Sequence, residues 1–568
     1  MFSFFSSIAS KLTDSNNSAK HDNDDDYVYN KHAQVTSIDA SSKPMFNLPV
    51  ISVDFVSREI DIMSEKKATG LDDISCKLLK LAKPVIVNSL TQIMNLSLKS
   101  GVFPNAWKEA KVIPLHKGGD LSVNNFRPIA ILPIVSKIIE KAVHKHLYSY
   151  LSEHNIINEN QSGFRPSHST ETCLINLVND WSNNMNAGNM TGVAFIDLRK
   201  AFDTVNHNIL LSKLQNLGAS VSALSWFNSY LKCRTQRVHF KDSLSNSCFV
   251  STGVPQGSVL GPLFFIIFIN SMSNVISHGK ISMYADDTTL SVSGNDAHAI
   301  SSKLTSDLHA VMNWLKKNKL VLNTDKTNIM LIGTGAKLKN ANDFSVFIDG
   351  QELERVNKAK CLGVLIDDKL KWHNQVNSIV QKVFCKIGIL RRLKPYLDVN
   401  TLNMIFKSFV QPIFDYCNIT WYGRFKDDIS KLDVIYKRCA RIILGVNYFT
   451  SSDFMFKVLG WERLQTRNEY FKALMMYKSL NGLVPHYLAT MFKYISTTHN
   501  VNTRQATAGQ LALPPLSNGY DIDCFKSSFM YNGVKLWNDI DIEIRNSVNV
   551  QSFKQKYKSV YFTGLVKQ

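Results

Sequence analysis

KISMYADDTTLSVS, residues 280–293, alternates apolar and small polar side chains on both sides of two adjacent carboxylates, Asp286 and Asp287. Alternation with a period of two is typical of strands, and this pattern predicts a hairpin with the acidic pair at or near its turn. Carboxylates inside an apolar stretch are costly unless a cation offsets their charge. The stretch therefore predicts a strand pair that presents two acids to a cation.

A second apolar run, GVAFID at residues 192–197, predicts a strand that ends in Asp197. Three carboxylates converging from a strand end and a hairpin turn suit two divalent metal ions about 3.5–4 Å apart, a geometry used for phosphoryl transfer. Mg²⁺ fits because it prefers a few carboxylates, waters and substrate phosphates to a full protein cage. The chain's other acidic pairs are interpreted as solvated loop residues: Asp72-Asp73, Asp367-Asp368 and Asp427-Asp428.

Helical spacing dominates much of the remaining chain. Apolar residues recur at helical intervals over residues 90–98 and 135–151, and LGPLFFIIFIN at 260–270 predicts a buried helix. His146, on the apolar face of the second segment, is expected to be a packed core residue and not a metal ligand. Past Leu370 the pattern is mainly helical.

One later helix is predicted to carry a basic face, because no Asp or Glu occurs between Lys369 and Asp398. The apolar positions share one helical face: Ile379, Val383, Ile387 and Leu390. The cations Lys382, Lys386 and Arg391 lie off that face. Such a helix can pack on its apolar side and follow a phosphate backbone on the other, the alternative being a merely solvated basic face.

The composition bounds the class of protein. A chain of 568 residues is too long for one compact domain and predicts three or four lobes. Lys and Arg number 65 against 46 Asp and Glu, and the net charge of +19 favours a polyanionic partner, with nucleic acid the first choice. The alternative is a soluble protein that is simply basic. Hydrophobic residues at 45% indicate a folded protein.

Several classes are not indicated. The longest apolar run, Val259–Ile269, contains Gly261 and Pro262 and falls short of the ~20 residues of a membrane span. The opening MFSFFSSIASK lacks the parts of a secretory signal. The nine cysteines are scattered without a CxxC, so neither a zinc knuckle nor a disulfide framework is supported. We expect a reduced, intracellular protein with no membrane partner.

A series of blocks in the chain resembles the reverse transcriptase of non-LTR (LINE-type, jockey-like) retrotransposons, and the blocks occur in the family's order. The resemblance covers roughly residues 55–495. The blocks are KATGLDDISCKLLK (67–80), WKEAKVIPLHKGGD (107–120), NNFRPIAILPIVSKIIEK (124–141), NQSGFRPSHST (160–170), FIDLRKAFDTVNH (195–207), GVPQGSVLGPLFF (253–265), YADD (284–287), LVLNTDKTNIMLI (320–332), CLGVLIDDKLKW (361–372) and MMYKSLNGLVPHYL (475–488).

The resemblance implies an α+β fold, the right-hand polymerase of fingers, palm and thumb, with a mainly helical C-terminal extension. It implies RNA-directed DNA polymerase activity, a nucleotidyltransferase that joins a dNTP to a primer 3′-hydroxyl with Mg²⁺ as cofactor and Mn²⁺ as the alternative. Its partners would be an RNA template, a DNA primer or target and dNTP. Asp197, Asp286 and Asp287 match the catalytic metal-binding carboxylates, and Lys326 matches a lysine proposed to donate a proton to pyrophosphate.

The resemblance also assigns nucleotide contacts. Lys117 and Arg127 match finger positions that grip the triphosphate, and Phe202 matches the steric gate that excludes a 2′-hydroxyl. Gln256 matches a residue that touches the nucleotide and template base, and Gly257 permits close backbone approach. The structural alternatives are a solvated basic loop for the cations and an ordinary core aromatic for the phenylalanine. Asp203, in the same motif as Phe202, is interpreted as structural.

Template and primer contacts are expected from Arg165, Leu362, Gly363, Lys382, Lys386 and Arg391. Arg165 has a structural alternative, and the roles of Leu362 and Gly363 would be positional. In the family the block at 253–265 is usually followed by an Asn-Asp pair, and this sequence departs from that pattern with Asn270-Ser271. The oligomeric state is open.

The expected organisation has five parts. A disordered leader covers residues 1–52, a helical extension 53–95, the fingers and palm 96–367, a helical thumb 368–445 and a region of unknown role 446–568. Related elements usually carry an endonuclease ahead of the polymerase, and because only about 55 residues precede the first block, a truncated element or partial gene is expected.

Two other functions stay open: a catalytically inactive or domesticated nucleic-acid-binding relic, and a group II intron maturase-like protein. The polymerase would be expected in the nucleus at integration, with the cytoplasm as an alternative.

Overall fold

The computed structural model describes residues 45–498, 509–517 and 522–562 as a mixed α/β protein. The chain divides into two compact units, each of which is described by itself. The first unit comprises the residues up to 164 together with 197–276 and 310–323, and the second comprises 165–196, 277–309 and the residues from 324 onward. Helix α10 (Ala297–Lys317) is shared between them.

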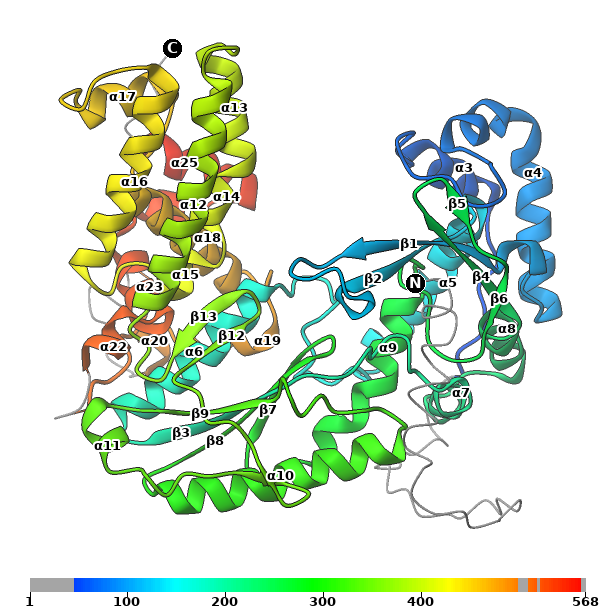
Figure 1. Ribbon diagram of the computed structural model, residues 1–568, viewed down its shortest axis with the longest axis horizontal. Coiled ribbons are helices and arrows are strands. Elements are labelled where there is room, and N and C mark those ends of the chain that lie inside the picture. Colours follow the sequence, from blue (N-terminus) through cyan, green and yellow to red (C-terminus); the bar gives the residue numbers. More distant parts are fainter. Residues whose placement is uncertain (1–44, 499–508, 518–521, 563–568) are drawn as a thin grey trace. The chain divides into compact units, whose positions relative to one another are not determined.

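The first unit is built on a five-stranded sheet with strands in the order β2-β1-β4-β5, while β6 pairs with β4 (Figure 1). Strand β1 runs antiparallel to β2 and parallel to β4. The strands are β1 (Glu109–His116), β2 (Phe126–Ile131), β4 (Arg234–Phe240), β5 (Ser243–Leu244) and β6 (Cys248–Val250). The helices are α3 (Val53–Ile62), α4 (Cys76–Ser100), α5 (Ile134–Glu153), α7 (His207–Asn216), α8 (Val221–Leu231) and α9 (Gly261–Ile269), with the 3-10 segments η1 (Asn105–Trp107), η2 (Val123–Asn125) and η3 (Asn270–Val275).

Helix α9 confirms the buried helix predicted from LGPLFFIIFIN, because every residue except Pro262 is buried. A helix that is apolar all round has no solvent face and must lie inside the protein. The predicted helices over residues 90–98 and 135–151 are also present, within α4 and α5.

The expectation of a disordered leader through residue 52 is wrong for residues 45–52, and residues 1–44 lie outside the described residues. Phe46 is buried, and its backbone exchanges hydrogen bonds with Gly218 and Ser220. Its ring stacks on Phe227 at a centroid distance of 6.2 Å. A single aromatic anchor in a polar stretch has no periodicity, so the pattern did not reveal it.

Two further expectations about this unit are corrected. The boundary at residues 95 and 96 falls inside α4, which Ser75 caps through Leu78 N–H and which ends at Gly101 in the left-handed region (φ 70°). His146 is exposed. Near the end of α5 the buried stripe narrows to Leu147 and Leu151, so the histidine lies outside the packed face.

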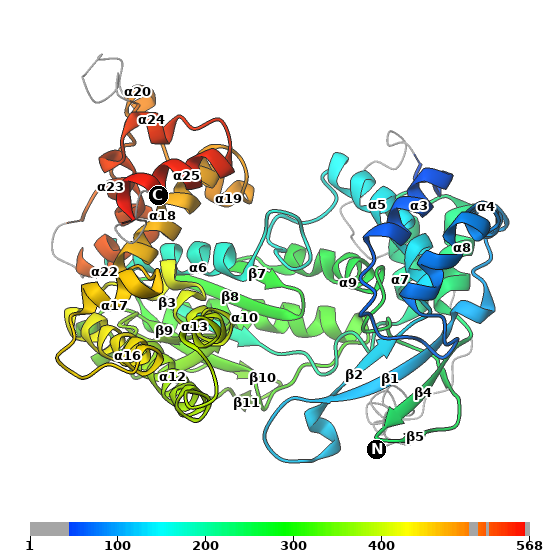
Figure 2. The same cartoon turned by 90° about the horizontal axis from the view of Figure 1, so that it is seen from above.

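The second unit contains a four-stranded antiparallel sheet in the order β7-β8-β3-β9. Its strands are β3 (Met190–Ile196), β7 (Lys280–Tyr284), β8 (Asp287–Gly294) and β9 (Asn328–Ile332). Tyr284 pairs with Asp287, so Ala285 and Asp286 form the turn and the predicted hairpin is confirmed. Helix α6 (Thr170–Asn186), started by a capping box between Ser169 and Thr172, packs beside β3 and β7 (Figure 2).

The rest of this unit is mainly helical, as predicted for the chain past Leu370. Four short strands form two ribbons: β10 (Phe347–Ile348) with β11 (Gln351–Glu352), and β12 (Lys358–Cys361) with β13 (Val364–Asp367). The helices are α11 (Gly335–Lys339), α12 (His373–Leu393), α13 (Val399–Phe409), α14 (Gln411–Asp415), α15 (Asn418–Trp421), α16 (Lys426–Leu444), α17 (Ser452–Leu459), α18 (Leu464–Leu480), α19 (His486–Ala489), α20 (Ile495–Thr498), α22 (Ile522–Ser527), α23 (Phe529–Asp539), α24 (Ile542–Arg545) and α25 (Val550–Tyr561).

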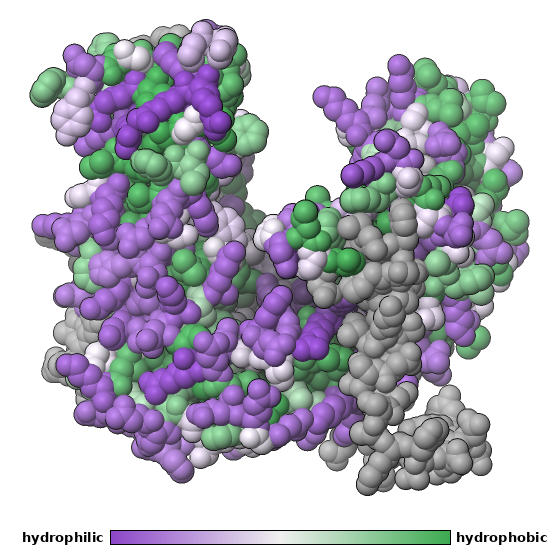
Figure 3. All heavy atoms as spheres, in the orientation of Figure 1, coloured by the Kyte–Doolittle hydropathy of each residue, from purple (hydrophilic) through white to green (hydrophobic). Residues whose placement is uncertain are grey.

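The predicted two-faced helix is α12. Its four apolar positions, Ile379, Val383, Ile387 and Leu390, are buried, and the helix packs against α16. Hydrophilic side chains cover much of the visible face of this helical part (Figure 3). The C-terminal helices have a separate aromatic core, in which Tyr477 stacks on Phe553 at 4.6 Å.

Within the described residues, no helix combines the length and the apolar character needed to cross a bilayer. The nine cysteines are free thiols.

The packing of β3 leads to a stability prediction at Gly192. A Cβ added there would meet Ile300 Cγ2 at 2.5 Å and Phe344 Cε2 at 3.0 Å, both in the core. Gly192→Ala should lower the free energy of unfolding by about 1–3 kcal/mol, measured by denaturant titration. Gly335→Ala is the matched control, because a Cβ there meets nothing within 4 Å. Equal stability of the two variants would contradict this account of the strand.

Candidate active site

The predicted acidic residues lie at one end of the β7-β8-β3-β9 sheet. Asp286 stands in the hairpin turn and Asp287 is the first residue of β8. The last pair between β3 and β8 joins Ile196 to Thr288, and Asp197 is the next residue along the chain from Ile196. Asp197 and Asp286 are half-buried and Asp287 is exposed.

Asp197 is held by the segment that precedes β9. Asn323 Nδ2 donates to Asp197 Oδ2 at 2.7 Å, and Asn323 N donates to the Asp197 carbonyl at 2.8 Å. These bonds fix the orientation of the carboxylate. Among the residues that the structure describes, no group of three or more His, Cys, Asp or Glu side chains is arranged to hold a metal ion.

The two finger cations are placed by the β1–β2 ribbon. Strand pairing sets Arg127 opposite Leu115, and Lys117, just past the end of β1, donates its N–H to Asn125 O at 2.7 Å. Both cationic side chains are exposed. The ribbon therefore brings Lys117 and Arg127 to the same end, which the sequence spacing alone did not establish.

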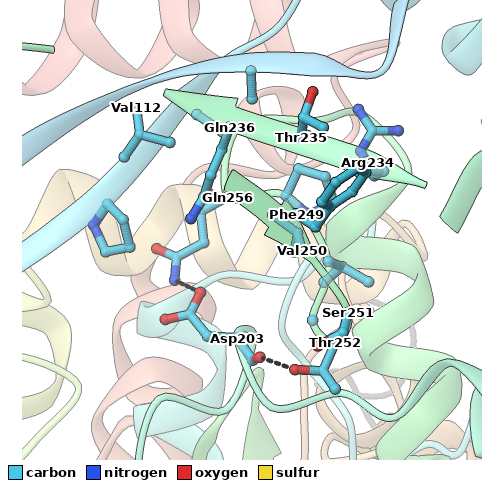
Figure 4. Close-up of a pocket in the computed structure, with 16 residues that line it drawn as sticks. Val112, Asp203, Arg234, Thr235, Gln236, Phe249, Val250, Ser251, Thr252 and Gln256 are labelled. Atoms are coloured by element: carbon cyan, nitrogen blue, oxygen red, sulfur yellow. Dashed lines mark hydrogen bonds between the residues drawn. The ribbon is translucent and has the colours of Figure 1, made fainter. Parts of the chain in front are cut away.

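A cavity of about 170 Å³ lies in the first unit, between the β1–β2 ribbon and the segment that carries GVPQG (Figure 4). The Gln256 side chain points to Asp203, and its Nε2 donates to Asp203 Oδ1 at 2.8 Å. The lining residues are Ala110, Val112, Pro128, Ala130, Asp203, Arg234, Thr235, Gln236 and residues 249–256.

Gly257 lies directly against β2. Its φ is 133°, a conformation that L side chains rarely adopt, and an added Cβ would run into the carbonyl oxygen of Ala130. Ala130 N in turn donates to Gln256 O at 2.7 Å. The strand and the loop are therefore in direct backbone contact.

The sequence predicted a structural role for Asp203 but not its contact with Gln256. Burial raises its pKa to about 6, although the Gln256 hydrogen bond and the charges of Lys200 and Lys117 act in the opposite direction. No local pattern signals the contact, because Asp203 and Gln256 are 53 positions apart. The structural interpretation of Asp203 is consistent with this geometry: its carboxylate orients the glutamine amide.

Phe202 is half-buried and packed among aromatic rings. Its ring stacks on Phe265 at 4.4 Å and meets Phe164 edge to face at 6.1 Å. Its carbonyl accepts Val254 N–H at 2.9 Å, which joins the block at 195–207 to the block at 253–265. Phe202 thus makes the contacts of a core aromatic residue, and its role as the steric gate stays a prediction.

The remaining candidates lie in the second unit. Lys326 is exposed in the turn before β9, and Arg165 is half-buried. Leu362 and Gly363 form the turn between β12 and β13, where Leu362 O accepts Tyr416 Oη–H at 2.7 Å. Of the α12 cations, Lys382 and Arg391 are exposed and Lys386 is half-buried.

The buried Asp203 leads to a pH prediction. Its pKa is raised in the folded protein, so between about pH 4 and 6 the folded state holds a proton that the unfolded state has lost, and this group's contribution to stability falls as pH rises. Asp203→Asn carries no such penalty and keeps an oxygen for Gln256. The variant should gain up to about 3 kcal/mol of stability relative to wild type between pH 4 and 8.

The measurement is thermal or denaturant unfolding of both proteins across that pH range. Asp242→Asn, at an exposed position of the same unit, is the control. A stability difference between wild type and Asp203→Asn that does not change with pH would show that Asp203 is not desolvated.

Comparison with known proteins gives independent evidence on the family that this chain resembles. Residues 115–366 match the family of reverse transcriptases (RNA-dependent DNA polymerases). The chain is 27% identical to a probable RNA-directed DNA polymerase from transposon BS, over 73% of this chain and 47% of that protein. It is 28% identical to the RNA-directed DNA polymerase from mobile element jockey, over 71% of this chain and 45% of that protein. Both relatives are from Drosophila melanogaster.

A third relative, a probable RNA-directed DNA polymerase from transposon X-element of the same species, is 28% identical over 69% of this chain and 44% of that protein. The chain thus spans about half the length of the curated relatives it matches. The matched region contains the hairpin, the GVPQG segment and the β1–β2 ribbon from residue 115 on. Residues 115–366 therefore match the reverse transcriptase family, and the resemblance of the chain to jockey-like non-LTR retrotransposon reverse transcriptases is confirmed.

Proposed function

We propose that the protein is an RNA-directed DNA polymerase that transfers nucleotides from dNTP to the 3′-hydroxyl of a DNA primer on an RNA template. The observation that carries the proposal is the Asp286 turn of the β7–β8 hairpin beside the end of β3, inside the segment that matches the reverse transcriptase family. The names of the relatives support the same activity.

The right-hand architecture is part of this proposal. The β7-β8-β3-β9 sheet would be the palm, the β1–β2 ribbon the fingers, and helices α12 to α16 the thumb. The exposed cations of α12 would then follow the phosphate backbone of the template and primer. Leu362 and Gly363, at a tight turn, would position the primer end, and Arg165 would contact the template.

The residue types of the three acids suit a divalent cation such as Mg²⁺, although within the described residues they are not arranged as a metal site. Carboxylate oxygens are the protein ligands that Mg²⁺ prefers, and Asp197, Asp286 and Asp287 supply them at a strand end and an adjoining turn. When bound, such ions would polarise the primer hydroxyl and offset charge on the triphosphate. Asn323 would keep the Asp197 carboxylate oriented for this task.

The chain's own residues would then bind and orient the nucleotide. Arg127 offers a planar fork of donors and Lys117 a point charge, both suited to phosphate oxygens. Gln256, oriented by Asp203, would meet the nucleotide and the template base. Lys326, exposed next to the sheet's β9, would donate a proton to the leaving pyrophosphate.

The central test is primer extension on an RNA template with Mg²⁺. Asp286→Asn keeps the shape of the turn but removes one negative charge, and extension should fall by at least about 10²–10³-fold. Asp343→Asn, an exposed acid in the same unit, should leave the rate unchanged. Circular dichroism would verify folding. Full activity of Asp286→Asn would refute the proposed site, and nucleic-acid binding without any extension by wild type would favour the relic.

The steric gate has its own test. Removing the ring in Phe202→Ala should raise the ratio of ribonucleotide to deoxyribonucleotide incorporation by about tenfold or more, because a pocket that no longer clashes with the 2′-hydroxyl loses its discrimination. Phe202→Tyr keeps the bulk and should keep the ratio. The ratio comes from single-nucleotide extension with rNTP or dNTP. An unchanged ratio in the alanine variant would leave Phe202 as a core aromatic only.

A further inference from the structure

Glu140 is a fully buried acid in the middle of α5 to which neither the motifs nor the proposed function assign a role. Charged side chains are almost never fully buried unless they are paired or hydrogen-bonded. We therefore expect the Glu140 carboxylate to have hydrogen-bond partners inside the protein.

The carboxylate binds the backbone that follows the GVPQG segment. Glu140 Oε2 accepts N–H groups from Val259 at 2.8 Å and Leu260 at 3.2 Å, and the Tyr230 hydroxyl donates to the same oxygen at 3.1 Å. Ser136 Oγ lies 3.3 Å from Oε1. Glu140 thus joins α5 and α8 to the start of α9.

Helix α9 needs such a partner. Its N-cap residue, Leu260, has no side chain that can accept a hydrogen bond, and the helix begins with Gly261 and Pro262. The first N–H groups of a helix have no partner inside the helix, and the positive end of the helix dipole favours an anion. The first helical N–H, that of Gly261, donates to Ser258 Oγ at 3.0 Å, and the two N–H groups just before it, those of Val259 and Leu260, donate to Glu140.

A nearby cation supports the charge. Arg234 is buried, its Nη1 donates to Tyr230 O at 2.9 Å, and its guanidinium lies 5.0 Å from the Tyr230 ring centre. Burial raises the pKa of Glu140, while Arg234 and the Val259 and Leu260 N–H groups lower it. Arg234 also lines the cavity that contains Gln256. Arg234 therefore belongs both to the buried network around Glu140 and to the lining of the cavity.

The same loop is fixed from its other side. Val254 N donates to Phe202 O at 2.9 Å, and Ala130 N donates to Gln256 O at 2.7 Å. Gly257 lies between the Gln256 contact and the Glu140 contacts at residues 259 and 260. Releasing the Glu140 end would remove the bonds at residues 259 and 260 and leave the contacts with Phe202, Ala130 and Asp203.

We propose that Glu140 is a positioning residue that sets the geometry of the Gln256–Gly257 loop through the N–H groups of Val259 and Leu260. The inference rests on the proposed function, in which this loop meets the incoming nucleotide. Glu140 touches no substrate. Its effect should appear in nucleotide binding, while primer–template binding stays unchanged.

The test uses three variants of the full chain: Glu140→Gln, Glu140→Leu and Tyr230→Phe. Leucine removes the acceptor and glutamine keeps one neutral acceptor oxygen, while phenylalanine removes the hydroxyl that meets Glu140 and the Ser258 side chain but keeps the acceptor of the Val259 and Leu260 N–H groups. In primer extension, Glu140→Leu should raise the KM for dNTP by about tenfold or more with a smaller effect on kcat, and Glu140→Gln should be intermediate. Tyr230→Phe should change KM by less than about threefold.

A double variant separates positioning from general destabilisation. If Glu140 acts through Gln256, Glu140→Gln combined with Gln256→Ala should raise KM no more than the larger single effect. If the two substitutions multiply each other's effects on KM, the proposal is overturned. It is also overturned if the Glu140 variants lower Tm without changing KM. If Glu140→Leu does not fold, the glutamine variant decides.

Amide hydrogen exchange distinguishes this proposal from the proposed function. The amides of Val259 and Leu260 should be protected in wild type and exchange faster in the Glu140 variants, whatever the activity. An inactive wild type would refute the polymerase but leave this readout intact. Unchanged protection of both amides in a folded Glu140→Leu variant would refute the positioning role.

Discussion

The pairing of β3 with β8 is the constraint on which the proposed site depends. Its register sets Ile196 against Thr288, so the residues next to this pair, Asp197 and Asp287, come to the same end of the sheet. A slip of one residue would turn every side chain of the strand to the opposite face. Such a slip is resisted because β3 is an inner strand, with β8 on one side and β9 on the other, and six of its seven residues are buried.

The GVPQG segment depends in turn on hydrogen bonds from three different parts of the chain. Phe202 O holds Val254, Ala130 N holds the Gln256 carbonyl, and Glu140 holds the start of α9. Each backbone group buried without a partner would cost about 1–3 kcal/mol, so the loop is stable only where all of these acceptors and donors are present. The loop that carries Gln256 is therefore held by hydrogen bonds to its surroundings, although the helix α9 that follows it is wholly apolar.

The sequence predicted those features that depend on neighbouring residues. The hairpin around Asp286, the buried helix α9 and the apolar face of α12 all follow from periodicities of two or about 3.6 within one element. Features that depend on distant residues were missed. Glu140 finds its partners at positions 230, 259 and 260, and Phe46 finds its partners at 218, 220 and 227. His146 is the opposite case. It lies on the apolar stripe of the sequence, but it is exposed because the buried face of α5 narrows near the end of the helix.

Two of the acidic pairs that the sequence analysis interpreted as solvated contain a buried acid, and both of these acids lie near the start of α12. Asp367 is buried and accepts N–H groups of Lys369, Lys371 and Trp372, while Asp428 is buried and lies 2.6 Å from His373 Nδ1. Both acids thus face inward, at the segment where α12 begins. Lys382 and Arg391 point outward along a helix that carries no acid. The acids near this helix hold it in place, and the cations remain at the surface, where a positive field can attract a polyanion.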